Sequence, residues 1–119
     1  MIPQYPRVAV TGIAFRLDFR WKDASGVPID VSSGYTCRVV LQGSDEADIV
    51  DTTSPDATIT LSDGANDSAN ISISIPKSTT SGWEVDDRAR YLVEIWPTAS
   101  ADDNNLIGWG PLSIQEGIL

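Results

Sequence analysis

The chain has 119 residues, of which 41% are hydrophobic and 21% are charged. These values predict one globular domain with a single core. Acidic residues outnumber basic ones by 17 to 8, which gives a net charge of −9. Because phosphate backbones and anionic lipid surfaces attract clustered Lys and Arg, this balance argues against nucleic-acid and membrane partners. The absence of histidine removes the commonest general base and the commonest metal ligand.

Features that report on the cellular compartment are few. Residues 1–7 lack the basic start and apolar centre of a secretion signal, so we expect the protein to be made and folded in a cytoplasm. No apolar run approaches the ~20 residues that a membrane-spanning helix needs. The single cysteine, Cys37, lies in an alternating apolar run and is predicted to be a small buried hydrophobe, not a reactive thiol.

The N-terminal part of the chain predicts an arm followed by a strand. Residues 1–12 contain prolines and are expected to form an extended arm, at most an edge strand, before a domain that spans 13–119. Residues 13–22 then alternate apolar and polar side chains, as a strand with one buried face does. The apolar members of this strand, predicted to face the core together, are Ile13, Phe15, Leu17, Phe19 and Trp21.

A turn at residues 23–26 follows, with Gly26 suited to the left-handed position that closes a hairpin-type loop. We expect a short extended piece over 27–31, a second turn, and a strand over 35–42. Residues 43–48 are polar and acidic and predict a loop, after which a short strand is expected to begin near 49–50.

The second half of the chain repeats this pattern. Strands are predicted at 58–61, 70–75, 90–96 and 106–114, with one helical turn within 76–82 and a polar hairpin tip at 98–105. Glycines and a proline inside 106–114 predict a bulge and an edge position. Short strands at this spacing, with turn signals between them and almost no helix, are typical of an all-β antiparallel sandwich of about seven strands.

The strand at 90–96 is apolar on both faces. Tyr91, Val93 and Ile95 share one face, and Leu92 and Trp96 share the other. Such a strand is either central in its sheet or covered on its outer face by another chain.

The order of turn and core residues over Gly12–Arg38 resembles a small immunoglobulin-like domain of tailed bacteriophages. The matching features are an alternating strand that ends in Trp21, an Asp-x-x-Gly turn at 23–26, and a Gly-Tyr-Thr turn at 34–36. The isoleucine strand and the strand around residue 93 also match, so the resemblance covers about 12–116. It implies an immunoglobulin-like β-sandwich in a baseplate, tail or tail-fibre protein, with no catalytic residues.

The tryptophans invite a second hypothesis. Flat aromatic rings stack on sugars and also anchor protein interfaces. Trp21 is in register with the predicted core, whereas Trp83, Trp96 and Trp109 could belong to a protein contact, to the core or to a glycan platform.

The acidic loops do not predict a metal-binding or catalytic site. Asp63-Gly64-Ala65-Asn66-Asp67 lacks the ligand spacing of a calcium loop, and solvated loop tips explain the other acids better. A paired-carboxylate glycosidase needs an acid in a cleft, which the pattern does not provide. We therefore expect no enzyme activity, no metal and no cofactor. Arg16, Arg20 and Lys22 form an outward stripe, suited to surface ion pairs or to an acidic partner.

The resemblance to the phage domains implies a non-enzymatic structural or adaptor component of a phage virion, in the tail, the baseplate or a tail-fibre attachment. Its partners are expected to be other virion subunits and copies of itself, with a trimer favoured because tail fibres usually have threefold symmetry. The alternatives are a carbohydrate- or receptor-binding module that recognises a host-surface glycan, and a capsid decoration protein. The candidate interaction residues are Leu92, Glu94, Trp96, Trp109, Trp83, Arg16 and Arg20.

Overall fold

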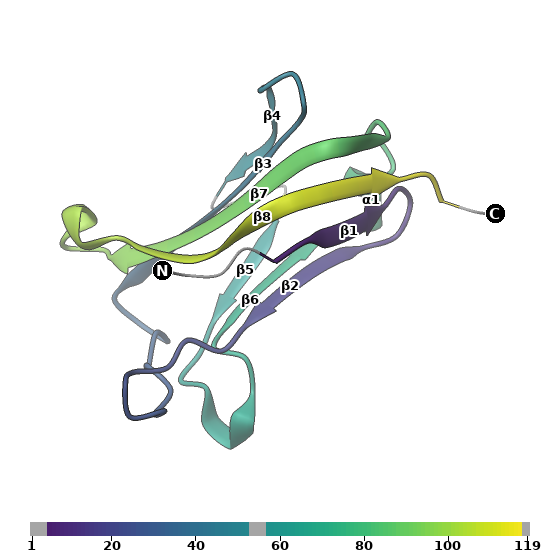
Figure 1. Cartoon of the computed structure of the whole chain (residues 1–119). Coiled ribbons are helices and arrows are strands. Elements are labelled where there is room, and N and C mark those ends of the chain that lie inside the picture. The colour runs from purple at the N-terminus through teal and green to yellow at the C-terminus, as the bar shows by residue number, and fades with distance from the viewer. Residues whose placement is uncertain (1–4, 53–56, 118–119) are drawn as a thin grey trace.

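The computed structural model describes residues 5–52 and 57–117. In this part of the chain two β-sheets pack face to face, and helix is limited to single turns (Figure 1). The strands are β1 (Arg7–Val10), β2 (Phe15–Phe19), β3 (Tyr35–Gln42), β4 (Asp48–Thr52), β5 (Thr58–Leu61), β6 (Ile71–Ile75), β7 (Asp86–Pro97) and β8 (Asn105–Gln115). The helical turns are η1 (Ala65–Asp67), α1 (Lys77–Thr80) and η2 (Ala101–Asp103).

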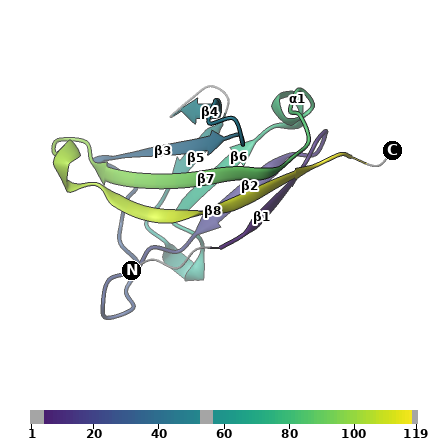
Figure 2. The same cartoon turned by 45° about the horizontal axis from the view of Figure 1, so that its top comes forward.

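The larger sheet has the strand order β1-β8-β7-β3-β4, and the smaller has the order β2-β6-β5. All neighbours are antiparallel except β1, which runs parallel to β8. Figure 2 shows the two layers from a second direction, with the long β7 and β8 in one and β2, β5 and β6 in the other. The predicted all-β sandwich is confirmed.

The core lies between the two sheets and is built by alternation along each strand. In β6 the three isoleucines are fully buried while Ser72 and Ser74 are half-buried on the other face. Burying an aliphatic side chain of this size contributes about 1.5–3 kcal/mol. The members buried most completely are Leu17, Leu41, Ile71, Ile73, Ile75, Ile95, Leu112 and Ile114.

The alternating run at 13–22 is shorter as a strand than predicted. Phe15 and Leu17 face the core, but Ile13 is 59% exposed, so its predicted core position is wrong. The reason is the turn before it: Gly12 adopts a left-handed φ of 80°, and the Ile13 amide donates to the Val10 carbonyl at 3.1 Å. Ile13 therefore belongs to the connection between the sheets.

Trp21 also departs from the prediction. It lies beyond the end of β2 and is only half-buried, at the margin of the core. Its ring meets Tyr35 edge-on, with the ring centroids 6.2 Å apart. The extended piece predicted over 27–31 forms no strand and contributes one bridge, between Lys22 and Pro28.

The buried side chain of Asn70 connects the backbone segments at this margin of the core. Asn70 is 1% exposed, and its side chain accepts a hydrogen bond from the Trp21 amide at 2.7 Å. It also donates to the carbonyls of Trp21 and Ile29, at 2.8 and 2.9 Å. One side chain thereby satisfies three backbone groups from two segments that lack a regular ladder.

The bulge predicted in the last strand is present, but the edge position is wrong. Val93 pairs with Gly108 and Glu94 with Leu106, so Ile107 is the extra residue. Beyond the bulge, the second half of β8 is interior because β1 pairs with it from Leu112 to Gln115. Thus the segment predicted as an N-terminal arm contributes a parallel edge strand.

Three smaller predictions agree with the structure. The turn at 23–26 closes with a hydrogen bond from the Gly26 amide to the Asp23 carbonyl, and Gly26 has a φ of 80°. One helical turn, α1, follows β6. Cys37 is 4% exposed and faces the core, as predicted.

Candidate interaction surface

The outer face of the larger sheet carries four of the seven candidate residues. Along β7, Tyr91, Val93 and Ile95 are buried in the core, and the residues between them are half-buried on the opposite face. Leu92, Glu94 and Trp96 therefore lie on the outer face, and Trp109 joins them because it pairs with Leu92. We call this surface the outer face of the larger sheet.

An apolar row crosses this face at its centre. Val40 on β3 pairs with Leu92 on β7, and Leu92 pairs with Trp109 on β8. Directly opposite residues in antiparallel strands have side chains close enough to touch. All three side chains are half-buried. The row ends at Asp51 on the edge strand β4, which pairs with Val40.

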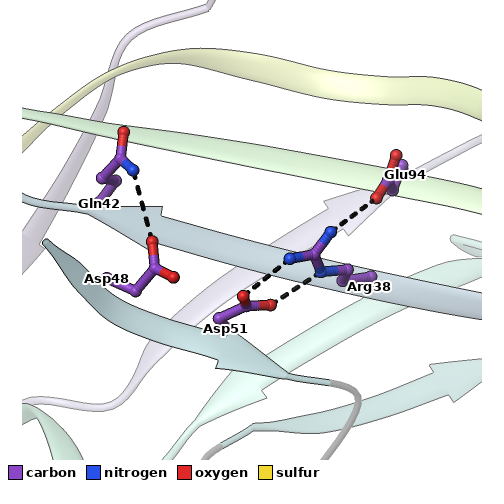
Figure 3. A network of polar contacts seen from close by, with 5 residues as sticks. All are labelled: Arg38, Gln42, Asp48, Asp51 and Glu94. Atoms are coloured by element: carbon purple, nitrogen blue, oxygen red, sulfur yellow. Dashed lines mark hydrogen bonds and ion pairs between the residues drawn. The ribbon is translucent and has the colours of Figure 1, made fainter. Parts of the chain in front are cut away.

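A charged row flanks the apolar row on one side. Arg38 pairs across the sheet with Glu94, and its guanidinium also reaches the edge strand (Figure 3). Arg38 donates two hydrogen bonds of 2.7 Å to Asp51 in a bidentate arrangement, and a third, of 3.4 Å, to Glu94 Oε1. The second oxygen of Glu94 accepts from Asn104 at 3.0 Å. This network fixes the three charged side chains in position across β4, β3 and β7.

The network perturbs the ionisation of its members. The hydrogen bonds from Arg38 hold the pKa of the Asp51 carboxyl below its usual value. The same bonds raise the pKa of the Arg38 guanidinium, so both groups stay charged over the ordinary pH range. Their side chains are 41% and 33% exposed, and water screens such pairs strongly. The network therefore orients this surface more than it stabilises the fold.

A second polar row flanks the apolar row on the other side. Gln42 pairs with Arg90, and Arg90 pairs with Pro111. Gln42 also donates to Asp48 on β4 at 3.4 Å (Figure 3). Between the two polar rows the face is hollowed into a shallow depression of about 670 Å³, with Leu92 and Trp109 in its lining. The surface thus has an apolar centre and a charged rim, the layout that protein interfaces share.

The remaining candidates lie elsewhere. Arg16 is on β2, with its side chain on the outer face of the smaller sheet, and it makes an exposed ion pair of 3.4 Å with Asp18. Arg20 is exposed just after the end of β2. The structure does not bring these two arginines together with the tryptophans of the larger sheet.

Trp83 belongs to a third region, between the β3–β4 loop and the start of β7. Its ring meets Phe15 edge-on at 6.3 Å, so part of it completes the core. It also lines a depression of about 840 Å³ whose other walls include Asp45, Glu84 and Asp86. Asp86 accepts backbone hydrogen bonds from Ser44 and Arg88, which lower the pKa of its carboxyl.

Several residues of the outer face were not among the candidates. Arg38, Val40 and Gln42 alternate with the core residues of β3, so their outward direction was visible in the sequence. Asp51 was not identifiable, because its contact with Arg38 depends on β4 pairing with β3 across an acidic loop.

Within residues 5–52 and 57–117, no three acidic or cysteine side chains are grouped so that they could hold a metal ion. No helix among these residues is long and apolar enough to cross a membrane.

Comparison with known proteins identifies the fold class. No protein-family model matches the chain, and no curated protein matches it. Among solved structures it resembles one from photo-crosslinking analyses of multimeric cell-adhesive interactions of VGSC beta subunits, with 15% identity and a TM-score of 0.53. That match covers 96% of this chain and 92% of the other. A match to Tim-1 has 12% identity and a TM-score of 0.48, and covers 100% and 98% of the two chains.

The fold is therefore an immunoglobulin-like β-sandwich, as predicted. β2, β6 and β5 occupy the positions of strands B, E and D, and β3, β7 and β8 those of C, F and G. β4 adds the further strand that variable-type domains place beside C. The disulfide that joins strands B and F in antibody domains cannot form, because Cys37 is the single cysteine and lies on β3.

Proposed function

We propose that this domain is a non-enzymatic packing module that binds other protein subunits through the outer face of the larger sheet. The observation that carries the proposal is the apolar row Val40–Leu92–Trp109, which lies half-buried between two rows of oriented polar side chains. Large apolar side chains at the centre of a polar rim are where binding energy concentrates in protein interfaces. The rigid β-sandwich behind the row holds its geometry.

We further propose that the assembly is a phage virion and that the domain is a structural or adaptor part of its tail or baseplate. The resemblance of Gly12–Arg38 to immunoglobulin-like domains of tailed phages supports this setting. The similar structure studied for multimeric cell-adhesive interactions supports the more general idea that this fold is used for contacts between several subunits. Tail-fibre symmetry by itself favours a threefold arrangement of copies, and a twofold pairing of copies is the competing arrangement.

The test combines binding with localisation. Wild type and Leu92→Glu would be mixed with purified tail and baseplate proteins, and co-sedimentation would be measured. Val27→Glu is the control, because Val27 is 55% exposed and lies in the loop between β2 and β3, outside the apolar row. We expect Leu92→Glu to abolish co-sedimentation and Val27→Glu to leave it intact. Equal loss in both variants, or a wild type that binds no virion fraction, would contradict the proposal.

A second experiment would then determine where in the virion the domain lies. Antibody labelling of purified particles, or a reconstruction of the particle, shows whether the domain lies at the tail or on the head. Labelling of the head alone would favour a capsid decoration protein over a tail component.

A carbohydrate- or receptor-binding module is the second candidate function. The observation that favours it is that Trp96 and Trp109 are half-buried on the same outer face, on neighbouring strands. A titration of tryptophan fluorescence with host surface polysaccharide distinguishes the two functions. A saturable change that Trp96→Ala removes would favour glycan binding, whereas an unchanged spectrum would favour protein packing.

A further inference from the structure

We propose that the partner on the outer face of the larger sheet is a second copy of this chain, related by a twofold axis that runs along the row Val40–Leu92–Trp109. In this arrangement β7 of one copy packs antiparallel across β7 of the other. The inference rests on the proposed function, because it names the occupant of the same surface.

The charge pattern of β7 carries the inference. Arg90 and Glu94 lie on the outer face, each two residues from Leu92 but in opposite directions. At a rise of about 3.4 Å per residue, each charge lies about 7 Å from Leu92 along the strand. A twofold axis through Leu92 and across the strands therefore places Arg90 of each copy opposite Glu94 of the other.

The alternative twofold arrangement is disfavoured by the same residues. An axis that runs along β7 would place Glu94 opposite Glu94 and Arg90 opposite Arg90. Like charges brought together at an interface weaken the complex. The charges of β7 thus complement each other in one orientation, which is what an isologous contact requires.

Both charges are able to take part in a contact between copies. The side chain of Arg90 is exposed, and none of the ion pairs among the described residues includes it. Glu94 is held in place by Arg38 and Asn104, one on each oxygen. A carboxylate has about four acceptor sites, so it can accept further hydrogen bonds from a second guanidinium. In the flanking rows, Arg38 of one copy meets the uncharged Gln42 of the other. Asp51, at the edge end of the row, faces Asp51 of the other copy, and each of these carboxylates is neutralised by the two hydrogen bonds from Arg38 of its own chain.

The dimensions are compatible with two packed sheets. Aligned sheets pack about 10 Å apart with their strands about 30° from parallel, a distance that an Arg and a Glu side chain span together. The four strands β8, β7, β3 and β4 make a face of about 20 by 27 Å, or about 500 Å² in projection. A standard interface buries about 800 Å² per partner, so this contact is at the small end and should dissociate on dilution.

The test is a charge exchange measured by sedimentation velocity over a range of concentrations. Arg90→Glu and Glu94→Arg each place like charges across the axis, so we expect the dissociation constant to rise at least about tenfold in either variant alone. A mixture of the two variants restores opposite charges at both positions, and we expect it to form a mixed dimer with close to the wild-type constant. Arg16→Glu makes the same charge change on the smaller sheet and should have no effect.

A cross-linking experiment tests the same axis without disturbing the charged network. Leu92 lies on the proposed axis, so Leu92→Cys should be joined to itself by a short bis-maleimide, whereas Ser74→Cys on the smaller sheet should not. The native Cys37 is buried and does not compete. Dimeric product from Leu92→Cys alone supports the inference, and equal cross-linking of both variants overturns it.

The failure of this inference is distinguishable from failure of the proposed function. A wild type that stays monomeric at every concentration, or a trimer that the charge exchange leaves unchanged, overturns the twofold pairing. In either case, loss of virion binding in Leu92→Glu would leave the packing function standing with a different partner.

Discussion

Phe19 and Gly108 meet across the two sheets at a distance that leaves no room for a methyl group. A Cβ on Gly108 would lie 2.5 Å from Cε1 and 2.7 Å from Cζ of the Phe19 ring. Phe19 is on β2 and Gly108 on β8, so the contact joins the smaller sheet to the larger one. The Arg7 guanidinium lies over the same ring, with its Cζ 5.9 Å from the ring centroid. The glycine inside β8 is therefore a packing requirement.

We expect Gly108→Ala to destabilise the domain by about 1–3 kcal/mol, the usual cost of overpacking, because the Phe19 ring must shift and loses its contact with Arg7. Urea denaturation measures the change. Gly82→Ala is the control, since the nearest atom to its added Cβ would be the Thr79 carbonyl oxygen at 3.7 Å. If both variants unfold at the same urea concentration, the packing explanation is wrong.

The second prediction concerns Asn70. Asn70→Ala removes the hydrogen-bond partner of the Trp21 amide and of the Ile29 carbonyl, whereas the Trp21 carbonyl keeps a second bond, from the Ile29 amide at 3.0 Å. Leaving the Trp21 amide and the Ile29 carbonyl unsatisfied at the core margin should lower the free energy of unfolding by about 2–3 kcal/mol. Asn105→Ala serves as the control, because its exposed side chain makes one hydrogen bond, to the Asp103 carbonyl. Thermal unfolding of the two variants gives the comparison, and a loss in Asn105→Ala as large as in Asn70→Ala would contradict the assigned role.

The alternation of apolar and polar residues along the sequence predicted most of the strands, because it shows directly which side chains are buried. The bounds of β3 and β5 match their predictions, and the isoleucines of β6 are buried as expected. Ile13 shows the limit of the method. Alternation continues through it in the sequence, but the glycine turn before it moves the chain from one sheet to the other. The local alternation of residues does not show where the chain passes from one sheet to the other.

The candidate site was predictable in part for the same reason. Alternation along β7 separated Leu92 and Glu94 from the core residues, but it could not say which other strands would lie beside them. The apolar row and the contact of Arg38 with Asp51 arise from the register of β4, β3, β7 and β8. Register depends on turns and bulges along the whole chain, so these relationships appear only in three dimensions.

The third prediction concerns the thiol of Cys37. Burial raises its pKa to about 12 from a usual value of 9.0, and the carboxylate of Glu94 adds to the effect. The folded protein should therefore react with a thiol-specific disulfide reagent only through unfolding, because the reagent needs an accessible thiolate. In urea the same cysteine should react at the rate of a free thiol. Rapid modification of the folded protein at neutral pH would show that Cys37 is not enclosed.

The raised pKa of Cys37 also predicts a loss of stability in alkali. The unfolded state loses its thiol proton above about pH 9 while the folded state keeps it up to about pH 12, so stability falls as the pH rises through that interval. Cys37→Ala removes the titrating group. The variant should be less stable at neutral pH because it leaves a small cavity, but its stability should depend less on pH between 9 and 11. An identical alkaline dependence in both proteins would exclude Cys37 as the cause.

The last prediction concerns acid. Hydrogen bonds from Arg38 lower the pKa of Asp51, and backbone amides, first of Ser44 and then of Arg88, lower that of Asp86. The unfolded state therefore takes up protons at a higher pH than the folded state does. The stabilisation from these two carboxylates is complete above their ordinary pKa of 3.8 and is lost as the pH falls through their folded values.

Carbon-13 NMR of the carboxyl groups measures both values directly. We expect Asp51 and Asp86 to titrate below 3.8 in the wild type. In Arg38→Gln the pKa of Asp51 should rise toward the ordinary value, because the first cause of its shift is removed, while that of Asp86 should stay where it was. Asp86 lies at the far end of β7 from the network and is the internal control. If both carboxyls moved together in Arg38→Gln, a general change in the fold would explain the shift, and the assigned hydrogen bonds would not.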